Sequence, residues 1–380
     1  MENIGIHDNY WLNVILSIIV AFGIVYTSIP SIVNVSKIKR LVDEPSQRKS
    51  HSRSIPNLGG IAIFAGILVS QSLFINFDSC NDLKFMIAAV IIVFFLGMKD
   101  DVLVIAPKKK LTGEILAALI IAVLGNIRLT SLHGFLGIQE VPYAVSILLT
   151  VFVIIVILNS VNLIDGIDGL AAGITILASL VFGSWFYLAG VYDYAIITAA
   201  IIGATAAFFL FNVFGKRHKI FMGDTGSLIL GLYLAALAIK FNEANIDISG
   251  PMKIAASPAV SIGILVVPLF DTLRVFILRA ASGKSPFIAD KNHVHHGLIG
   301  LGLSHLSATL WILAANILFI VLAFLFRNKG IINVTLFLLL LAILFTYLPT
   351  HLLKRRGIEL NDNGNGNGNG NGNGHMEGHH

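Results

Sequence analysis

Four polar residues recur at every third position between two long apolar runs, and they are Asn159, Asn162, Asp165 and Asp168. If the segment is helical, neighbours three apart fall on one stripe of its surface. No Lys or Arg lies between the two runs, so the aspartates have no cationic partner close in sequence. Acidic groups near membrane-spanning segments are costly and usually functional. The stripe therefore predicts a catalytic or ligand-binding site, because a structural role would need partners from elsewhere.

A second acidic site is the pair Asp100 and Asp101, which follows Gly97 and precedes Lys108, Lys109 and Lys110. Adjacent carboxylates repel, so Mg²⁺ or a cationic group is expected to keep both ionised. Neighbours on a helix project about 100° apart, which predicts different tasks for the two aspartates. A solvated helix cap is the alternative for an isolated pair of this kind.

A third aspartate, Asp224, stands between Gly223 and Gly226 where an apolar run begins, and Lys216, Arg217 and Lys219 come shortly before it. A carboxylate at such a helix start can hold a metal ion that also contacts phosphate oxygens. Asp is also a good helix N-cap residue, and this second interpretation stays open for Asp224 alone.

The first polar loop combines positive charge with a glycine pair at a helix start. Phosphate binding is one interpretation, because free backbone N–H groups and the helix dipole reinforce the cations. A basic loop facing anionic lipid is the other, and for the isolated segment it is favoured. It leaves Pro56, Gly59 and Gly60 unexplained. The candidate ligand-binding residues here are Lys49, His51, Arg53 and Asn57.

Three histidines within four residues, His293, His295 and His296, form the last polar group. No Cys or close carboxylate completes a tetrahedral zinc set. Imidazoles that hydrogen-bond phosphate or sugar are the better interpretation. Nearby, Asp271 and Arg274 stand three residues apart and are expected to form an ion pair first, with phosphate binding by the arginine second.

These residues are embedded in a chain that is 56% hydrophobic and 12% charged over 380 residues, a composition typical of membrane proteins. We predict an all-α polytopic integral membrane helix bundle of about eleven transmembrane helices. The predicted runs lie near 11–34, 56–77, 84–98, 111–127, 143–160, 170–190, 192–213, 221–241, 254–277, 306–326 and 331–349.

The distribution of basic residues predicts the orientation of the bundle. With the N-terminus outside, 20 of the 26 Lys and Arg residues fall in loops on the cytoplasmic side, together with every unusual polar residue. The active site is therefore expected at the cytoplasmic face of the plasma membrane, with the C-terminus also cytoplasmic. We predict a single transmembrane catalytic domain over residues 1–355 and a disordered Asn-Gly and His-rich tail over 356–380. The only cysteine, Cys80, permits no intramolecular disulfide.

Carboxylates, cations and histidines at one membrane face suit phosphoryl transfer between a soluble donor and a lipid acceptor. The chain resembles the polyprenyl-phosphate N-acetylhexosamine-1-phosphate transferases, above all the bacterial members that use undecaprenyl phosphate. The resemblance runs in order from about Asp43 to His296. Five motifs carry it: residues 48–60, Gly97 with Asp100 and Asp101, Asn162 to Leu170, Phe221 to Ser227, and His293 to His296.

The resemblance implies a Mg²⁺-dependent reaction, with Mn²⁺ as an alternative ion, between UDP-N-acetylglucosamine and undecaprenyl phosphate. The products would be a lipid-linked pyrophosphoryl sugar and UMP, in a first membrane step of O-antigen, lipopolysaccharide, enterobacterial common antigen or wall teichoic acid synthesis. It implies metal binding by Asp224, Asn162 and Asp100. Asp101, Asp165 and Asp168 would join Asp100 as catalytic residues. The remaining residues would bind substrate, and they are Lys49, His51, Arg53, Asn57, Asn159, His293, His295 and His296.

Other members of this branch use different UDP-N-acetyl sugars, so the donor stays open. An ion-coupled transporter is the main alternative from another class, although carriers place their charges near the bilayer midplane and often show repeated halves. A scaffold protein is a third. Besides its two substrates, the chain is expected to contact membrane lipids and no nucleic acid, and a homodimer is left open.

Overall fold

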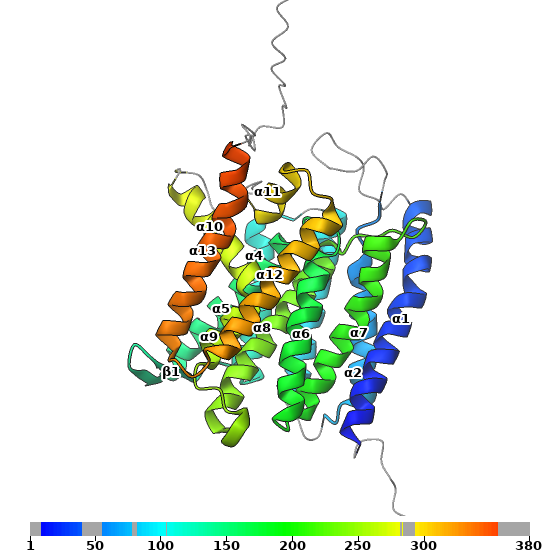
Figure 1. Ribbon diagram of the computed structural model, residues 1–380. Helices are drawn as coiled ribbons and strands as arrows, with labels where there is room; N and C mark the ends of the chain where they lie inside the picture. Colours follow the sequence, from blue (N-terminus) through cyan, green and yellow to red (C-terminus); the bar gives the residue numbers. More distant parts are fainter. Residues whose placement is uncertain are drawn as a thin grey trace, which may run out of the picture.

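The computed structural model describes residues 9–39, 55–77, 82–103, 105–281, 283 and 293–355. These residues form one bundle whose long helices run side by side, with α1 (Tyr10–Ile38) at one edge and α13 (Ile331–Arg355) toward the other (Figure 1). The predicted 356–380 tail and the loop residues Lys49, His51 and Arg53 lie outside the described residues. The predicted helix-bundle class is confirmed for the described part of the chain, apart from one short β-hairpin.

The remaining helices follow in chain order. In the first half they are α2 (Gly59–Phe74), α3 (Asp82–Leu103), α4 (Pro107–Leu119) with a π-helical continuation (Ile120–Leu124), α5 (Tyr143–Leu163), α6 (Leu170–Leu188) and α7 (Tyr192–Phe214). In the second half they are α8 (Gly223–Asp247), a 3₁₀ turn (Gly250–Met252), α9 (Ser257–Ile264), α10 (Val266–Ala281), α11 (Val294–Gly300) and α12 (His305–Leu325). A short antiparallel hairpin, β1 (Ser131–Phe135) and β2 (Ile138–Glu140), precedes α5 and was not predicted.

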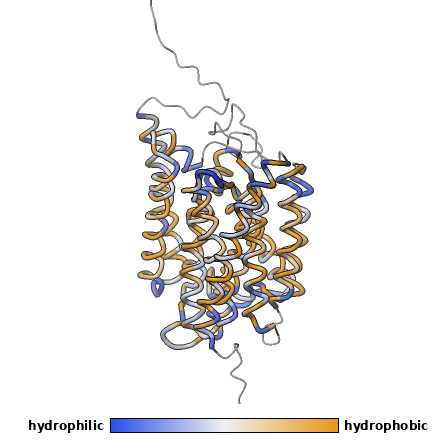
Figure 2. Tube along the Cα trace, turned by 90° about the vertical axis from the view of Figure 1, so that its right-hand side faces the viewer, coloured by the Kyte–Doolittle hydropathy of each residue, from blue (hydrophilic) through white to orange (hydrophobic). Residues whose placement is uncertain are grey.

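All eleven predicted apolar runs are helical, but they do not all meet the requirements for a span. Hydrophobic residues occupy the middle of the bundle and hydrophilic ones gather at its two ends (Figure 2). By length and composition, seven described helices could cross a membrane, or eight if α9 and α10 count as one. The helix α2 has 16 residues, fewer than the roughly 20 that a straight crossing needs. The structure thus supports a multi-pass membrane protein, and eleven crossings stay a prediction.

The run predicted at 254–277 is broken into α9 and α10, which meet at an angle of 81°. Pro268 explains the break, because it has no N–H to donate to the carbonyl of Ile264 one turn earlier. That carbonyl instead accepts a hydrogen bond from the Asn316 side chain of α12, at 3.2 Å. The neighbouring helix α12 thus stabilises the break. The hydrophobic periodicity of residues 254–277 alone could not reveal it.

The most enclosed helix is α8, which packs against α2, α3, α5, α6 and α9. Its first turn lies against glycines of two neighbours. A Cβ on Gly60 of α2 would collide with the backbone of Gly226, and one on Gly97 of α3 would lie 2.5 Å from Cα of Thr225. Backbone atoms cannot move aside as a flexible side chain can, so both glycines are needed for this approach. They hold the start of α8 at the ends of α2 and α3.

The substitution Gly97→Ala is expected to lower the thermal unfolding midpoint of the protein in detergent. Its methyl group would overlap the backbone of α8, and overpacking of this kind costs about 1–3 kcal/mol. Gly23→Ala is the matched control, since a Cβ on Gly23 of α1 meets nothing within 4 Å. Equal midpoints for the two variants would contradict the close packing of α3 on α8.

Candidate active site

Side chains from the ends of four helices meet beside the start of α8. Asp224 lies in the first turn of α8, and its Oδ1 accepts a hydrogen bond from the Asn162 amide of α5 at 2.5 Å. The same amide donates to Ser227 at 2.8 Å. From α4, the Lys110 ammonium lies 2.9 Å from Oδ2 of Asp100 and 3.1 Å from Oδ2 of Asp224. The three residues expected to bind metal are thus brought together from α3, α5 and α8.

Asp100 and Asp101 differ in their partners, as their angular separation on α3 predicts. Asp100 accepts a hydrogen bond from the Ile105 N–H at 2.7 Å through Oδ1, and its Oδ2 faces Lys110. Burial acts to raise the pKa of Asp100, but interactions with Asp224, Ile105 and Lys110 outweigh it and hold the pKa below its usual value. This carboxylate therefore stays ionised beside the cation.

Asp101 caps the start of α8. Its Oδ1 accepts from the N–H of Asp224 at 2.8 Å, and its Oδ2 accepts from the N–H and hydroxyl of Thr225 at 3.0 and 2.6 Å. Gly223 has a φ of +71° and leaves space for the Asp101 carboxylate. A Cβ on Gly223 would lie 2.7 Å from both oxygens of Asp101. Burial raises the pKa of Asp101 to about 6, although these hydrogen bonds act in the opposite direction. Both oxygens of Asp101 are therefore engaged by the first turn of α8.

Replacing Asp101 by Asn is expected to lower the thermal unfolding midpoint, because an amide has one accepting oxygen and leaves either the Asp224 N–H or Thr225 facing an NH₂ group. Leaving a buried donor without an acceptor costs about 1–3 kcal/mol. Asp247→Asn removes the same charge from the exposed far end of α8 and should melt like the wild type. A D101N protein that also melts like the wild type would show that the cap contributes no stability.

Asp165 and Asp168 lie in the connection between α5 and α6, not on a helix as the every-third-residue pattern suggested. The helix α5 ends at Leu163, and Gly169, with a φ of +79°, is the N-cap that precedes α6. Asp168 pairs with Lys219 at 2.6 Å and lies 3.5 Å from His305. Burial tends to raise the pKa of Asp168, but His305 and Lys219 outweigh it and lower the pKa. Asp168 thus has the distant cationic partner that a structural role requires.

Asp165 has a different environment. No hydrogen bond to its carboxylate is recorded among the described residues. Burial, reinforced by the charges of Asp224, Asp101 and Asp168, raises the pKa of Asp165 well above its usual value. A carboxylate so placed beside other carboxylates is suited to accept a cation or a ligand donor.

The glycine pair of the first loop does not offer free N–H groups to a phosphate. The N–H of Gly59 donates to the Phe221 carbonyl at 3.0 Å, and that of Gly60 donates to Met222 at 2.9 Å. Backbone pairing with the segment before α8 thus explains these glycines, and this part of the phosphate-binding interpretation is wrong. Asn57 is half-buried and donates to the carbonyl of Asp101 at 3.3 Å, so it remains beside the site.

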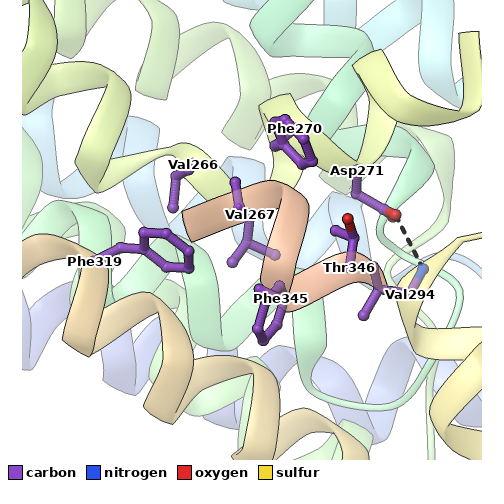
Figure 3. A pocket seen from close by; sticks show the side chains of 9 residues that line it. Val266, Val267, Phe270, Asp271, Val294, Phe319, Phe345 and Thr346 are labelled. Atoms are coloured by element: carbon purple, nitrogen blue, oxygen red, sulfur yellow. Dashed lines mark hydrogen bonds between the residues drawn. The ribbon is translucent and has the colours of Figure 1, made fainter. Parts of the chain in front are cut away.

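The histidine segment is fixed by Asp271 of α10. Its Oδ2 lies 2.8 Å from Nδ1 of His293. Its Oδ1 accepts a hydrogen bond from the N–H of Val294 at 3.0 Å, which Figure 3 shows as a dashed line. The carboxylate thereby determines where α11 begins, a role that the sequence did not indicate. The expected ion pair with Arg274 stays a prediction.

The other two histidines, His295 and His296, lie beside His293. His295 is buried, its ring lies 4.3 Å from that of His296, and its Nε2 contacts Gly166, where any side chain would collide. Burial and the neighbouring His296 lower the pKa of His295 to about 3, so its imidazole is neutral. No hydrogen bond to its Nε2 is recorded in the described part of the chain. The histidine segment therefore packs directly on the Asp165 to Asp168 connection.

Three site residues were not selected from the sequence. Lys110 was one of three consecutive lysines, and only the fold distinguishes it. His305 follows the histidine segment by nine residues and belongs to none of the motifs. Glu114, one helical turn after Lys110, is 1% exposed and accepts a hydrogen bond from Asn159 at 2.7 Å. The i,i+4 spacing of Lys110 and Glu114 places both residues on one face of α4. The sequence does not show that α5 packs against this face and brings Asn159 to Glu114.

The donor set fits a magnesium ion. Mg²⁺ is usually held by one or two carboxylates together with substrate phosphates and water. Asp100 and Asp224 are two such carboxylates, and the side-chain oxygen of Asn162 is a third hard donor if the amide turns. No group of three His, Cys, Asp or Glu ligands occurs among the residues that the structure describes. A dedicated cage such as a structural zinc site is therefore not found there.

Comparison with known proteins identifies the family of this chain. Glycosyl transferase family 4 matches residues 83–242. The undecaprenyl-phosphate alpha-N-acetylglucosaminyl 1-phosphate transferase of Escherichia coli O157:H7 is 31% identical over 290 residues, 75% of this chain and 76% of its own length. A Bacillus subtilis (strain 168) protein named "Probable undecaprenyl-phosphate N-acetylglucosaminyl 1-phosphate transferase" is 30% identical over 345 residues, 89% of this chain and 91% of its own length. The chain therefore belongs to glycosyl transferase family 4, and it is a membrane enzyme of the polyprenyl-phosphate sugar-1-phosphate transferase type.

Proposed function

We propose that the enzyme transfers N-acetylglucosamine-1-phosphate from UDP-N-acetylglucosamine to undecaprenyl phosphate. The products are undecaprenyl-pyrophosphoryl-N-acetylglucosamine and UMP. The observation that carries the proposal is the convergence of Asp100 and Asp224 on the Lys110 ammonium, with Asn162 hydrogen-bonded to Asp224. The names of the two relatives support the choice of sugar and lipid.

Asp224, Asp100 and Asn162 are the residues proposed to hold the metal. Bound there, Mg²⁺ would neutralise charge on the donor's diphosphate. In the present arrangement Asn162 donates through Nδ2 to Asp224 and Ser227, so its amide would turn to present its oxygen to the metal. Asp165, without a recorded donor, is close enough to interact electrostatically with Asp224 and is proposed to orient the uridine or a metal ligand.

In the reaction, an oxygen of the lipid phosphate attacks the β-phosphorus of the donor. The bond between that phosphorus and the bridging oxygen breaks, and the oxygen leaves on UMP. A phosphate monoester has a second pKa near 6, so the nucleophile is largely ionised at neutral pH. A strong general base is not required. This agrees with the engagement of both Asp101 oxygens by α8, and we assign Asp101 to positioning.

The polyprenyl tail needs an apolar channel that ends near the site. A cavity of about 360 Å³ lies between α5, α8, α9, α10, α13 and the β1 hairpin. Its lining includes Ile157, two residues before Asn159, and Leu269, two residues before Asp271. We propose that it holds part of the tail, because its walls continue into the helices that carry the site.

The histidine segment and Lys219 are proposed to bind the donor's phosphates or sugar. His293 is held by Asp271, and the buried His295 has its Nε2 against Gly166. Lys49, His51, Arg53 and Asn57 complete the proposed binding set. We place this site at the cytoplasmic face, with the N-terminus outside, because 20 of 26 basic residues favour that orientation.

The deciding experiment incubates purified protein with MgCl₂, undecaprenyl phosphate and a panel of UDP-sugars, and measures UMP. Release with UDP-N-acetylglucosamine alone is the expected result. Release with another UDP-N-acetyl sugar would change the donor, and release with none would contradict the proposal. Family membership leaves no support for the transporter alternative; uptake into proteoliposomes without UMP formation would be its signature.

A further inference from the structure

The Lys110 ammonium lies where two carboxylate oxygens from different helices converge. In Asp100, Oδ1 is held by the N–H of Ile105 and Oδ2 points at the lysine. In Asp224, Oδ1 is held by Asn162 and Oδ2 points at the same lysine. Each carboxylate thus has one oxygen fixed by the protein and one directed to a shared cation.

This arrangement is only partly open to water, so its charge balance matters. The side chains of Lys110, Asp100 and Asp224 are 16%, 9% and 32% exposed. Two carboxylates this close repel unless a cation lies between them. Among the described residues, Lys110 is the cation in recorded contact with either of them. It therefore supplies the neutralisation that a divalent ion would otherwise supply.

A metal ion and this ammonium cannot share the position. Magnesium binds oxygen at about 2.0–2.1 Å and needs the lone pairs that now accept from Lys110. Two cations between the same oxygens would also repel each other. A lysine has a flexible four-carbon stem, so it can withdraw without movement of the helix.

We propose that Lys110 is an internal counter-ion that competes with the divalent cation for Asp100 and Asp224, and that metal binding displaces it. This inference rests on the proposed function, which places the metal at these residues. It goes further by making the metal affinity depend on an ion pair that must first be broken. Without metal, the two acidic helix ends stay together through the lysine.

The test is a titration of the full-length protein in detergent with Mn²⁺, following free Mn²⁺ by electron paramagnetic resonance. Lys110→Met should bind Mn²⁺ at least about threefold more tightly than the wild type, because no partly buried ion pair has to be broken. Lys109→Met is the matched control, since it removes the same charge from the exposed neighbouring position and should bind like the wild type. Lys110→Arg, which keeps the charge, should not tighten binding.

Equal or weaker Mn²⁺ binding by K110M would overturn the inference. If K110M is too unstable to titrate, Lys110→Gln is the second variant and carries the same expectation. A second measurement is the rise in thermal unfolding midpoint on adding Mn²⁺, which should be larger for K110M than for the wild type. The titration needs no turnover. A wild type that binds Mn²⁺ but releases no UMP would therefore contradict the proposed function alone.

Discussion

Asp224→Asn is expected to lower the turnover of UMP release by at least about 100-fold, the scale seen when preorganised charge stabilisation is removed. Asp224 is the point where the site's helices meet, since its two oxygens contact Asn162 of α5 and Lys110 of α4. An amide keeps the shape but loses the negative charge that both a metal ion and Lys110 require. Turnover is measured at saturating UDP-N-acetylglucosamine, undecaprenyl phosphate and MgCl₂.

The matched control is Asp247→Asn, which removes the same charge from the exposed far end of the same helix. It should keep wild-type turnover. The unfolding midpoint of D224N shows whether the loss reflects chemistry or folding, because Asp224 donates its backbone N–H to Asp101 and that contact survives the change. Near-normal turnover in a folded D224N protein would mean that the proposed site is misplaced.

Asp100→Asn is expected to produce a loss of similar size, again at least about 100-fold. Its Oδ2 is the second oxygen directed at the shared cation position, and the Ile105 N–H holds its Oδ1 in place. The amide can preserve one of these contacts, but it presents no charged oxygen to the cation.

The measurement is UMP release by D100N over a range of MgCl₂ concentrations. Asp100 and Asp101 are neighbours with different tasks, so the two Asn variants separate them. D100N should lose turnover with little change in melting, whereas D101N should lose stability first. The opposite outcome would reverse the roles given to the pair.

The fold class was predictable because lipid permits few backbone solutions. Apolar runs of sufficient length must be helical, and every predicted run contains helix. The number of spans was less predictable. Pro268 breaks the predicted run into α9 and α10. The freed Ile264 carbonyl is satisfied by Asn316, which lies 52 positions later in the sequence.

The acidic residues of the site could also be selected from the sequence, since charge beside membrane-spanning runs is costly and seldom retained without use. The sequence did not show which groups each acidic residue contacts in the folded protein. Gly59 and Gly60 suggested a phosphate loop, but their N–H groups are bonded to Phe221 and Met222. Sequence composition cannot show whether a distant backbone segment already occupies such donors.

By itself, the sequence determined that this is a helical membrane protein, which polar residues form the candidate site and which family it resembles. Only the tertiary structure decided that Asp101 holds α8, that Asp271 holds His293 and that Lys110, one of three adjacent lysines, lies between Asp100 and Asp224. The physical reason is range. Hydrophobicity and helix periodicity are determined by residues close together in the sequence, whereas hydrogen bonds and ion pairs between helices depend on how the whole bundle packs.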